Sequence, residues 1–236
     1  MNRWIATSAA LCAAFVTSSA QADTLSSGGN SIGSITRISK GVKELGLEMN
    51  VVFKSDTVKG KDQQPDTTNS QLALVGAPVF RYFIIDNLAL GLHLGGFYKS
   101  ASSKTGDVEN KTSDVGFLGT LTAAYYAGLG GGMFVAPMVG GGGFFGNRET
   151  SSPDPAGSGK PIVQRASLSG AAVRAGIGLV FYSSPRFNLF ARPEAIIYLG
   201  SSKPKEEANT TTPVDTSSRG FTSIDGGFTC GFSYIF

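Results

Sequence analysis

The chain has 236 residues, of which 32 are glycine and only 16% are charged, and its formal net charge is +3. So small a net charge argues against a nucleic-acid-binding protein, and the absence of a Gly-X-Y period argues against collagen. After residue 22 there is no run of about 18 apolar residues, which argues against a transmembrane helix. A membrane protein without such helices has one other architecture, a closed barrel of strands.

The first 22 residues have the features of a secretory signal peptide. Arg3 supplies the basic region, an apolar core covers residues 5–16, and Ala20-Gln21-Ala22 forms a small-residue cleavage site. The apolar core is too short to span a bilayer as a helix in the mature protein. Cleavage would leave Cys230 as the only cysteine, which argues against a disulfide framework and a cysteine-based metal site.

Eight segments follow in which large apolar side chains alternate with small or polar ones. In the first of them, Leu45, Leu47 and Met49 alternate with Gly46 and Glu48. This period of two predicts strands with one apolar face, and each segment is long enough to cross a bilayer at the usual tilt. The segments run from Lys43 to Lys54, Gln71 to Phe83, Leu88 to Tyr98, Asp114 to Tyr126, Gly132 to Asn147, Ser167 to Tyr182, Phe187 to Leu199 and Gly220 to Phe236.

The links between these segments alternate between long and short. The long links are polar and cover residues 55–70, 100–113, 148–166 and 200–219, and the short ones are Asp86-Asn87, Ala127 to Gly131 and Ser183 to Arg186. This alternation is typical of an up-and-down barrel with external loops and periplasmic turns. The sequence therefore predicts an all-β fold, an eight-stranded antiparallel up-and-down transmembrane β-barrel over residues 43–236. A Ser/Gly-rich leader over residues 23–42 is expected to lie in the periplasm or to plug part of the barrel mouth.

The last strand carries a row of aromatic side chains at Phe228, Phe232, Tyr234 and Phe236, separated by small or polar residues. Such a row suits a wall that faces lipid. It resembles the C-terminal strand of bacterial outer-membrane β-barrel proteins, which typically ends in Phe. The resemblance implies that Phe232, Tyr234 and Phe236 form a signal read by the barrel assembly machinery.

The segment from Arg81-Tyr82-Phe83 through Asp86-Asn87-Leu88-Ala89-Leu90-Gly91 resembles the second-to-third strand hairpin of the small porin-like outer-membrane barrels. That group includes OmpX, OmpW and the transmembrane part of OmpA. The resemblance covers the whole mature chain at the level of pattern. It implies a monomer in the bacterial cell outer membrane, surrounded by outer-membrane lipid, and leaves the function open because the group is functionally diverse.

Charged residues on the polar faces of the strands are the candidate site. An eight-stranded barrel has an interior just wide enough to be filled by side chains, and charges buried there must pair. We expect an ion-pair network in the lumen, with three arginines facing Glu48, Glu194 and Asp225. The alternative is an ion-selective constriction in a narrow pore. The residues of the predicted network are Glu48, Arg81, Arg174, Arg192 and Glu194.

Three functions are compatible with this sequence. The first is a structural or narrow-pore, porin-like barrel, which would admit small solutes poorly. The second is a surface-interaction protein, adhesin-like or resistance-type, whose loops bind surface ligands. The third, a lipid-modifying enzyme, needs a His beside a nucleophilic Ser and an acid. His93, the only histidine, is expected to be a hydrogen-bonded lumen residue instead, so the prediction is a protein without enzymatic activity, cofactor or metal.

Three further expectations concern local structure. Gly140 to Gly143 should ease the curvature of a small barrel or leave room for bulky lumen groups from neighbouring strands. Pro78, Pro137 and Pro193 fall within strands, so a bulge is expected at one or more of them. Aromatic residues near strand ends are expected to form girdles at the two membrane interfaces, and these are Tyr82, Phe83, Tyr98, Tyr125, Tyr126, Phe181, Tyr182, Tyr198, Tyr234 and Phe236.

Overall fold

The computed structural model describes residues 35, 37–58, 66–106, 108–153, 161–205 and 217–236. The predicted signal peptide and most of the predicted leader lie outside these residues. Among the described residues, no helix is long and apolar enough to cross a membrane. The strands are β1 (Lys43–Val58), β2 (Thr67–Ile85), β3 (Leu88–Thr105), β4 (Val108–Tyr125), β5 (Ala127–Gly130), β6 (Met133–Ser152), β7 (Ile162–Ser184), β8 (Phe187–Pro204) and β9 (Arg219–Ile235).

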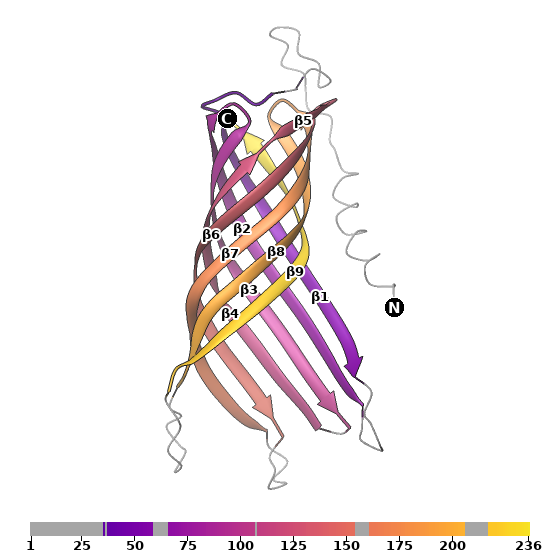
Figure 1. The fold of residues 1–236 in the computed structure, drawn as a ribbon, viewed down its shortest axis with the longest axis vertical. Coiled ribbons are helices and arrows are strands. Elements are labelled where there is room, and N and C mark those ends of the chain that lie inside the picture. The colour runs from indigo at the N-terminus through magenta and orange to yellow at the C-terminus, as the bar shows by residue number, and fades with distance from the viewer. Residues whose placement is uncertain (1–34, 36, 59–65, 107, 154–160, 206–216) are drawn as a thin grey trace.

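The strands form one antiparallel sheet that closes on itself (Figure 1). Consecutive strands pair with each other, β6 pairs with β4, and β1 pairs with β9 to close the ring. The short turns gather at one end of the barrel, called the turn end below, and the strand ends at Val58, Ser152 and Pro204 lie at the other, the loop end. The predicted antiparallel up-and-down barrel is confirmed.

The fourth strand of the barrel is interrupted once, which is why nine segments make eight strands. β4 and β5 pair with β6 in the same register, from Ala124↔Met138 on one side of the gap to Ala127↔Val135 on the other. The gap falls opposite Pro137, whose nitrogen carries no hydrogen to donate. The short link predicted from Ala127 onward is therefore wrong, because β5 continues the strand.

The turn after β5 is made by glycines. Gly130, Gly131 and Gly132 all have positive φ, between 63° and 89°, a region that glycine enters without steric cost. At the β2–β3 turn Asn87 has a φ of 62°. The predicted tight turn at Asp86-Asn87 is thus confirmed, since Asn tolerates this conformation.

The expected bulges at the in-strand prolines are not present. The β2–β3 ladder lacks pairs at Pro78 and the β7–β8 ladder lacks pairs at Pro193, but the register is the same on both sides of each gap. A missing N–H removes a rung without requiring an inserted residue. The register shifts that do occur lie beside turns, at Phe83/Ile85, Gly128/Gly130 and Tyr182/Ser184.

The strands continue past the apolar part of the barrel at the loop end. β3 and β4 pair as far as Thr105↔Val108, so the long link predicted over residues 100–113 is wrong. Hydroxyl pairs across the strands support this extension, with Thr67 and Thr105 Oγ1 atoms 2.8 Å apart and Ser70 and Ser102 Oγ atoms also 2.8 Å apart. Polar residues on both faces suit a sheet that is surrounded by water. Because apolar and polar side chains do not alternate there, the sequence pattern did not predict this part of the strands.

The turn end is closed by the end of the leader. Ile38 is buried in the barrel mouth. Its amide donates to Asn87 Oδ1 at 2.7 Å, and the Asn87 amide donates to its carbonyl at 2.9 Å. The amide of Gly41 donates to the carbonyl of Phe83 at 2.8 Å. Residues 37–42 are therefore fixed to the β2–β3 turn and cover this mouth.

Candidate functional site: the filled lumen

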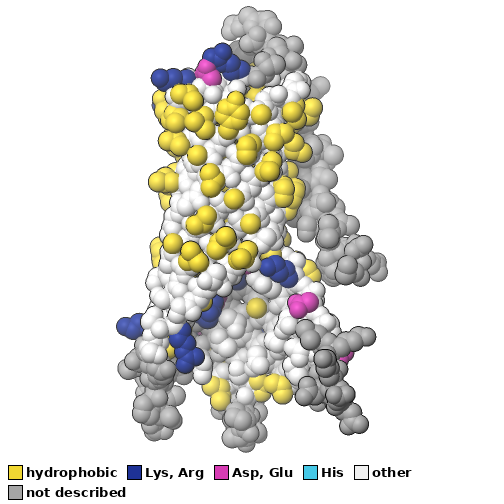
Figure 2. All heavy atoms as spheres, viewed as in Figure 1, with side chains coloured by type: hydrophobic (Ala, Val, Ile, Leu, Met, Phe, Trp, Pro, Cys, Tyr) yellow, Lys and Arg dark blue, Asp and Glu magenta, His cyan; other side chains and the backbone are white. Residues whose placement is uncertain are grey.

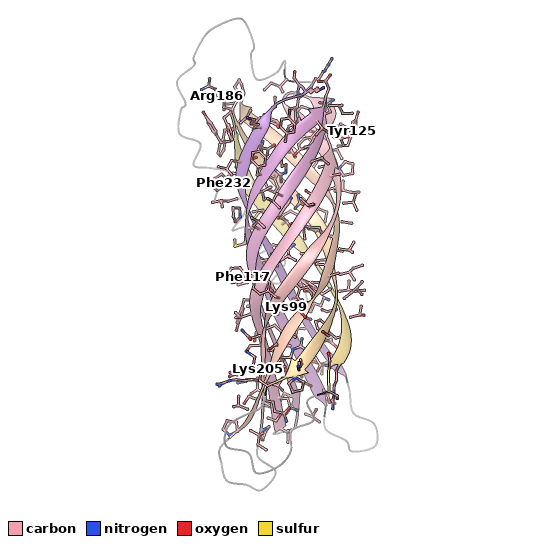
Figure 3. All side chains as sticks on the ribbon, turned by 90° about the vertical axis from the view of Figure 1, so that its left-hand side faces the viewer. Lys99, Phe117, Tyr125, Arg186, Lys205 and Phe232 are labelled. Carbon is pink, nitrogen blue, oxygen red and sulfur yellow. The ribbon has the colours of Figure 1, made fainter. Side chains whose placement is uncertain are left out.

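Alternation along each strand separates a polar and aromatic interior from an apolar exterior. On β1, Glu44 and Glu48 are buried, whereas Leu45 and Leu47 are about half exposed. Figure 2 shows hydrophobic side chains spread over a broad band of the outer surface. Figure 3 shows Phe117 and Phe232 projecting outward from the wall. Leu121 is 68% exposed, which is unfavourable in water and favourable in hydrocarbon.

Arg174 of β7 lies at the centre of the lumen and is 1% exposed. Its Nη2 is 2.7 Å from Oε1 of Glu48, and its Nε donates to Oε1 of Glu194. Its Nη1 is also 2.9 Å from Nδ1 of His93. A guanidinium with donors in several directions can hold groups from different strands at once, and here it joins β7 to β1, β3 and β8.

Arg192 and Glu194, both on β8, complete the central cluster. Arg192 Nη2 lies 3.0 Å from Glu48 Oε2 and 2.9 Å from Glu194 Oε2. The hydroxyl of Thr229 donates to the same Glu194 oxygen at 2.7 Å, which brings in β9. The two carboxylates thus lie between two guanidinium groups, and the central cluster carries no large net charge.

His93 is part of this cluster. Its Nδ1 is 2.7 Å from Glu48 Oε1, and its Nε2 is 2.9 Å from Thr122 Oγ1 on β4. Both ring nitrogens therefore have partners, in the arrangement expected of a hydrogen-bonded lumen histidine. Within the described ranges, no group of three His, Cys, Asp or Glu side chains is placed to hold a metal ion.

Arg81 does not join the central cluster. Its Nη1 donates to Oε1 of Glu44 at 2.7 Å, one layer closer to the turn end. Asn188 Nδ2 contacts the same carboxylate at 3.3 Å, and Ser233 Oγ contacts it as well. Glu44 is on the polar face of its segment and was missed as a site residue. The alternation of Glu44 with the outward-facing Leu45 is the sequence feature that could have identified it as a lumen residue.

Asp225 also has a different partner from the expected one. Its carboxylate lies 2.6 Å from Nζ of Lys99, on the loop-end side of the central cluster. The same ammonium stands 3.4 Å from the centre of the Tyr198 ring. The expectation that Asp225 would face an arginine is therefore wrong, because the stagger of the strands brings Lys99 of β3 to this height.

Apolar side chains close the lumen on both sides of the charged layer. The cluster at the turn end packs aromatic rings edge to face, for example Phe134 against Tyr182 at 5.5 Å between ring centres. The cluster toward the loop end does the same with Phe144 and Tyr198 at 5.3 Å. The turn-end cluster includes Ile38, Phe83, Tyr126, Phe134, Tyr182 and Phe190, and the loop-end cluster includes Val75, Phe97, Leu118, Phe144, Leu168 and Tyr198.

These clusters correct the prediction of the aromatic girdles. Phe83, Tyr126, Tyr182 and Tyr198 are buried in the lumen, so they belong to the interior. Paired aromatics at neighbouring positions, such as Tyr125-Tyr126, point to opposite faces of a strand. The remaining six members of the predicted girdles are not among the buried residues. Phe228, Phe232, Tyr234 and Phe236 of the last strand are all exposed on the outer wall.

The fold and its surface define the class. A closed antiparallel barrel with an apolar exterior band and an interior filled by side chains is the architecture of the small transmembrane β-barrels of outer membranes. The chain therefore has the fold and the surface of a transmembrane β-barrel of this class.

Comparison with known proteins gives matches to solved structures alone, since no protein-family model and no curated protein matches the chain. It is similar to Ail, the attachment invasion locus protein of Yersinia pestis, at 15% identity over 84% of this chain and 99% of that chain, with a TM-score of 0.37. It is similar to a major outer membrane protein from Thermus thermophilus at 14% identity over 82% of this chain and 99% of that chain, with a TM-score of 0.45. It is similar to the outer membrane protein OprG from Pseudomonas aeruginosa at 16% identity over 84% of this chain and 97% of that chain, with a TM-score of 0.40.

Proposed function

We propose that the protein is a closed barrel without enzymatic activity that serves as a structural element of the outer membrane, with its lumen sealed against solutes. The observation that carries the proposal is the charged cluster around Arg174. This cluster takes side chains from β1, β3, β4, β7, β8 and β9, so it links most of the wall across the interior.

Two properties of the cluster favour a structural role over an ion pathway. A conducting constriction needs sites that an ion can enter and leave, whereas Glu48 and Glu194 are each bound by two arginines. The apolar clusters on either side of it, including Phe134 and Phe144, offer an ion no compensation for lost water.

Electrical recording tests the closed state. The purified full-length protein is inserted into a planar lipid bilayer, with a known open porin as the positive control for insertion and detection. We expect no stepwise conductance under conditions in which heat-modifiable gel migration shows folded barrel. A reproducible ion-selective conductance from the folded protein would show that the lumen is a pore and would overturn the proposal.

The structural role of the cluster is tested by stability. Arg174→Ala leaves two buried carboxylates short of a partner, a change that typically costs about 3–5 kcal/mol. Arg165→Ala is the matched control, because Arg165 pairs with Glu149 at 3.1 Å on the exposed surface, where a pair contributes about 0–1 kcal/mol. Urea unfolding in detergent should show a large loss for the first variant and little for the second. Equal losses of unfolding free energy in the two variants would contradict a stabilising role of the charged cluster.

A second candidate function, interaction at the cell surface, is favoured by the loop end of the barrel. There the strands extend past the apolar band, and a shallow pocket is lined by Asn147, Glu149, Arg165 and Lys205 among others. Figure 3 shows Lys205 at this end of the molecule. Among the residues that the structure describes, cations outnumber anions on the outward face of the extension, which carries Lys104, Lys111, Arg165, Lys203 and Lys205 against Glu109 and Glu149.

An anionic ligand would suit such a surface. Protein in lipid nanodiscs would then bind immobilised heparin, used here as a polyanionic probe, and would elute at lower salt after Lys203→Ala and Lys205→Ala are combined. Lys43→Ala, at the turn end, is the control for overall charge. If the protein did not bind heparin, or if Lys43→Ala lowered the eluting salt concentration as much as the double substitution, the surface-interaction function would be excluded.

A further inference from the structure

Two rows of outward-facing residues cross β4, β6, β7 and the end of β8 near the loop end. The rows consist of Ser113, Glu149, Arg165 and Lys205, and, one step closer to the turn end, of Val115, Asn147, Ser167 and Lys203. One step further along β4 and β6, Phe117 faces Phe145. The centres of their rings lie 5.6 Å apart, and both side chains are exposed on the outer wall. The apolar band therefore borders directly on these two rows.

The shallow pocket at the loop end lies among these residues and has a volume of about 340 Å³. Its lining includes Val115, Asn147, Arg165 and Lys205. Val115 is also exposed on the apolar wall, so the pocket is continuous with the surface that suits hydrocarbon. Figure 3 shows Lys205 nearer to the loop end than Phe117. A molecule bound here would therefore meet apolar side chains toward the membrane and cations toward the water.

Arg165 and Lys205 keep hydrogen-bond donors that their neighbours do not use. Nε of Arg165 donates to Oε2 of Glu149 at 3.1 Å, and Nζ of Lys205 donates to Oδ1 of Asn147 at 2.7 Å. A guanidinium has five N–H donors and an ammonium has three, so each group can bind a further acceptor. The amide of Lys205 donates to the carbonyl of Arg165 at 2.8 Å, which holds the two residues side by side.

The charge of the pocket favours an anion. Among the described residues that line it, Glu149 is the only acid, whereas Arg148, Arg165 and Lys205 are cations. A phosphate suits this set, because a guanidinium can bind two of its oxygens at once and a lysine binds it as a point charge. A soluble phosphate would make no use of Val115, and an uncharged lipid would make no use of the cations. A lipid with a phosphorylated headgroup would use both parts of the surface.

We propose that this pocket binds one membrane lipid through its headgroup phosphate. Arg165 and Lys205 bind the phosphate, and the acyl chains lie along Val115 and the pair Phe117 and Phe145. Arg165 binds Glu149 through Nε, which leaves its two Nη groups for the phosphate oxygens. The proposal rests on the second candidate function, an anionic ligand at the loop end, and identifies that ligand as a lipid.

Native mass spectrometry of the purified, folded protein in detergent tests the proposal with three probes. Dimyristoyl phosphatidic acid carries a phosphate and acyl chains, dimyristoylglycerol carries the chains alone, and glycerol phosphate carries the phosphate alone. At equal concentrations we expect an adduct of one molecule with phosphatidic acid and none with the other two probes. An equal adduct with glycerol phosphate would make the pocket a site for soluble phosphates, and an equal adduct with dimyristoylglycerol would show that the phosphate is not recognised. Either result would overturn the proposal.

Two pairs of substitutions locate the binding site. Arg165→Ala with Lys205→Ala should lower the affinity for phosphatidic acid about tenfold or more, because hydrogen bonds to a charged group are lost. Lys43→Ala with Lys104→Ala is the matched control, since it removes the same charge from exposed residues that do not line the pocket. Heat-modifiable gel migration shows whether each variant is folded. An equal loss in both pairs, or no loss in the first, would contradict binding at this pocket.

Phe145→Ala separates a lipid from a soluble polyanion. The affinity for phosphatidic acid should fall severalfold, because the acyl chains lose an apolar contact, while the salt concentration that elutes the protein from heparin should not change. An unchanged affinity for phosphatidic acid would contradict the placement of the chains. Heparin binding without a phosphatidic acid adduct would overturn the proposal and leave the second candidate function standing, whereas the absence of both would remove both.

Discussion

At the scale of single residues, the barrel depends on side chains that are absent as much as on those that are present. Gly140 and Gly142 of β6 face the lumen where β4 passes close behind them. A Cβ at Gly142 would lie 1.9 Å from the carbonyl oxygen of Gly119, and one at Gly140 would lie 2.5 Å from that of Leu121. The glycine tract therefore permits a close approach of two strand backbones.

This close approach predicts different effects for neighbouring substitutions. Gly142→Ala should lower the free energy of unfolding by about 1–3 kcal/mol, because backbone must move to admit the methyl group. Gly143→Ala is the control, since its Cβ would stand 3.5 Å from the nearest atom, the carbonyl oxygen of Gly170. Urea titration of refolded protein in detergent measures both. Similar stabilities for the two variants would show that β4 and β6 are not held this closely.

At the scale of strands, the sequence predicts which segments pair but not where they stop. Alternation is visible wherever one face meets lipid, as for Leu88 to Tyr98, and the number and direction of the strands follow from it. Beyond the apolar band both faces are polar, so alternation disappears although the ladder continues to Thr105. The pairing of Lys99 with Asp225 was out of reach for a related reason, because it depends on the stagger between strands that are distant in sequence.

The interruption of the fourth strand gives a prediction at this scale. The ladder with β7 passes Pro137 without a break, whereas the ladder with β4 and β5 stops opposite it. The missing N–H therefore belongs to the β4 side, facing Tyr125. In Pro137→Ala the new amide should bond across this gap and join β4 to β5.

Hydrogen exchange measures this change directly. The amide of residue 137 in the variant should exchange as slowly as that of Val139, which lies within the continuous ladder. Pro185→Ala, in the turn between β7 and β8, is the control, and its new amide should exchange rapidly. Rapid exchange at residue 137 would mean that the break has another cause.

At the scale of the whole molecule, the side chains of the lumen and those of the outer surface have different roles. The lumen links the strands through buried charges and aromatic rings, while the exterior serves the membrane. Phe236 belongs to the second group, since it lies on the outer wall and is 62% exposed. We propose that Phe232, Tyr234 and Phe236 also recruit the barrel assembly machinery, a role that concerns the unfolded chain rather than the finished barrel.

Assembly and stability can be separated by comparing two aromatic residues of nearly equal exposure. Phe117 is 61% exposed on the outer wall of β4, so Phe117→Ala and Phe236→Ala remove similar lipid contact from the folded protein. Their free energies of unfolding should fall by similar, small amounts, about 1–3 kcal/mol as for other large apolar side chains. The yield of folded protein in the outer membrane should fall several-fold for Phe236→Ala alone, because that variant also weakens the signal. Equal yields, measured by quantitative immunoblotting of outer-membrane fractions, would limit Phe236 to contact with lipid.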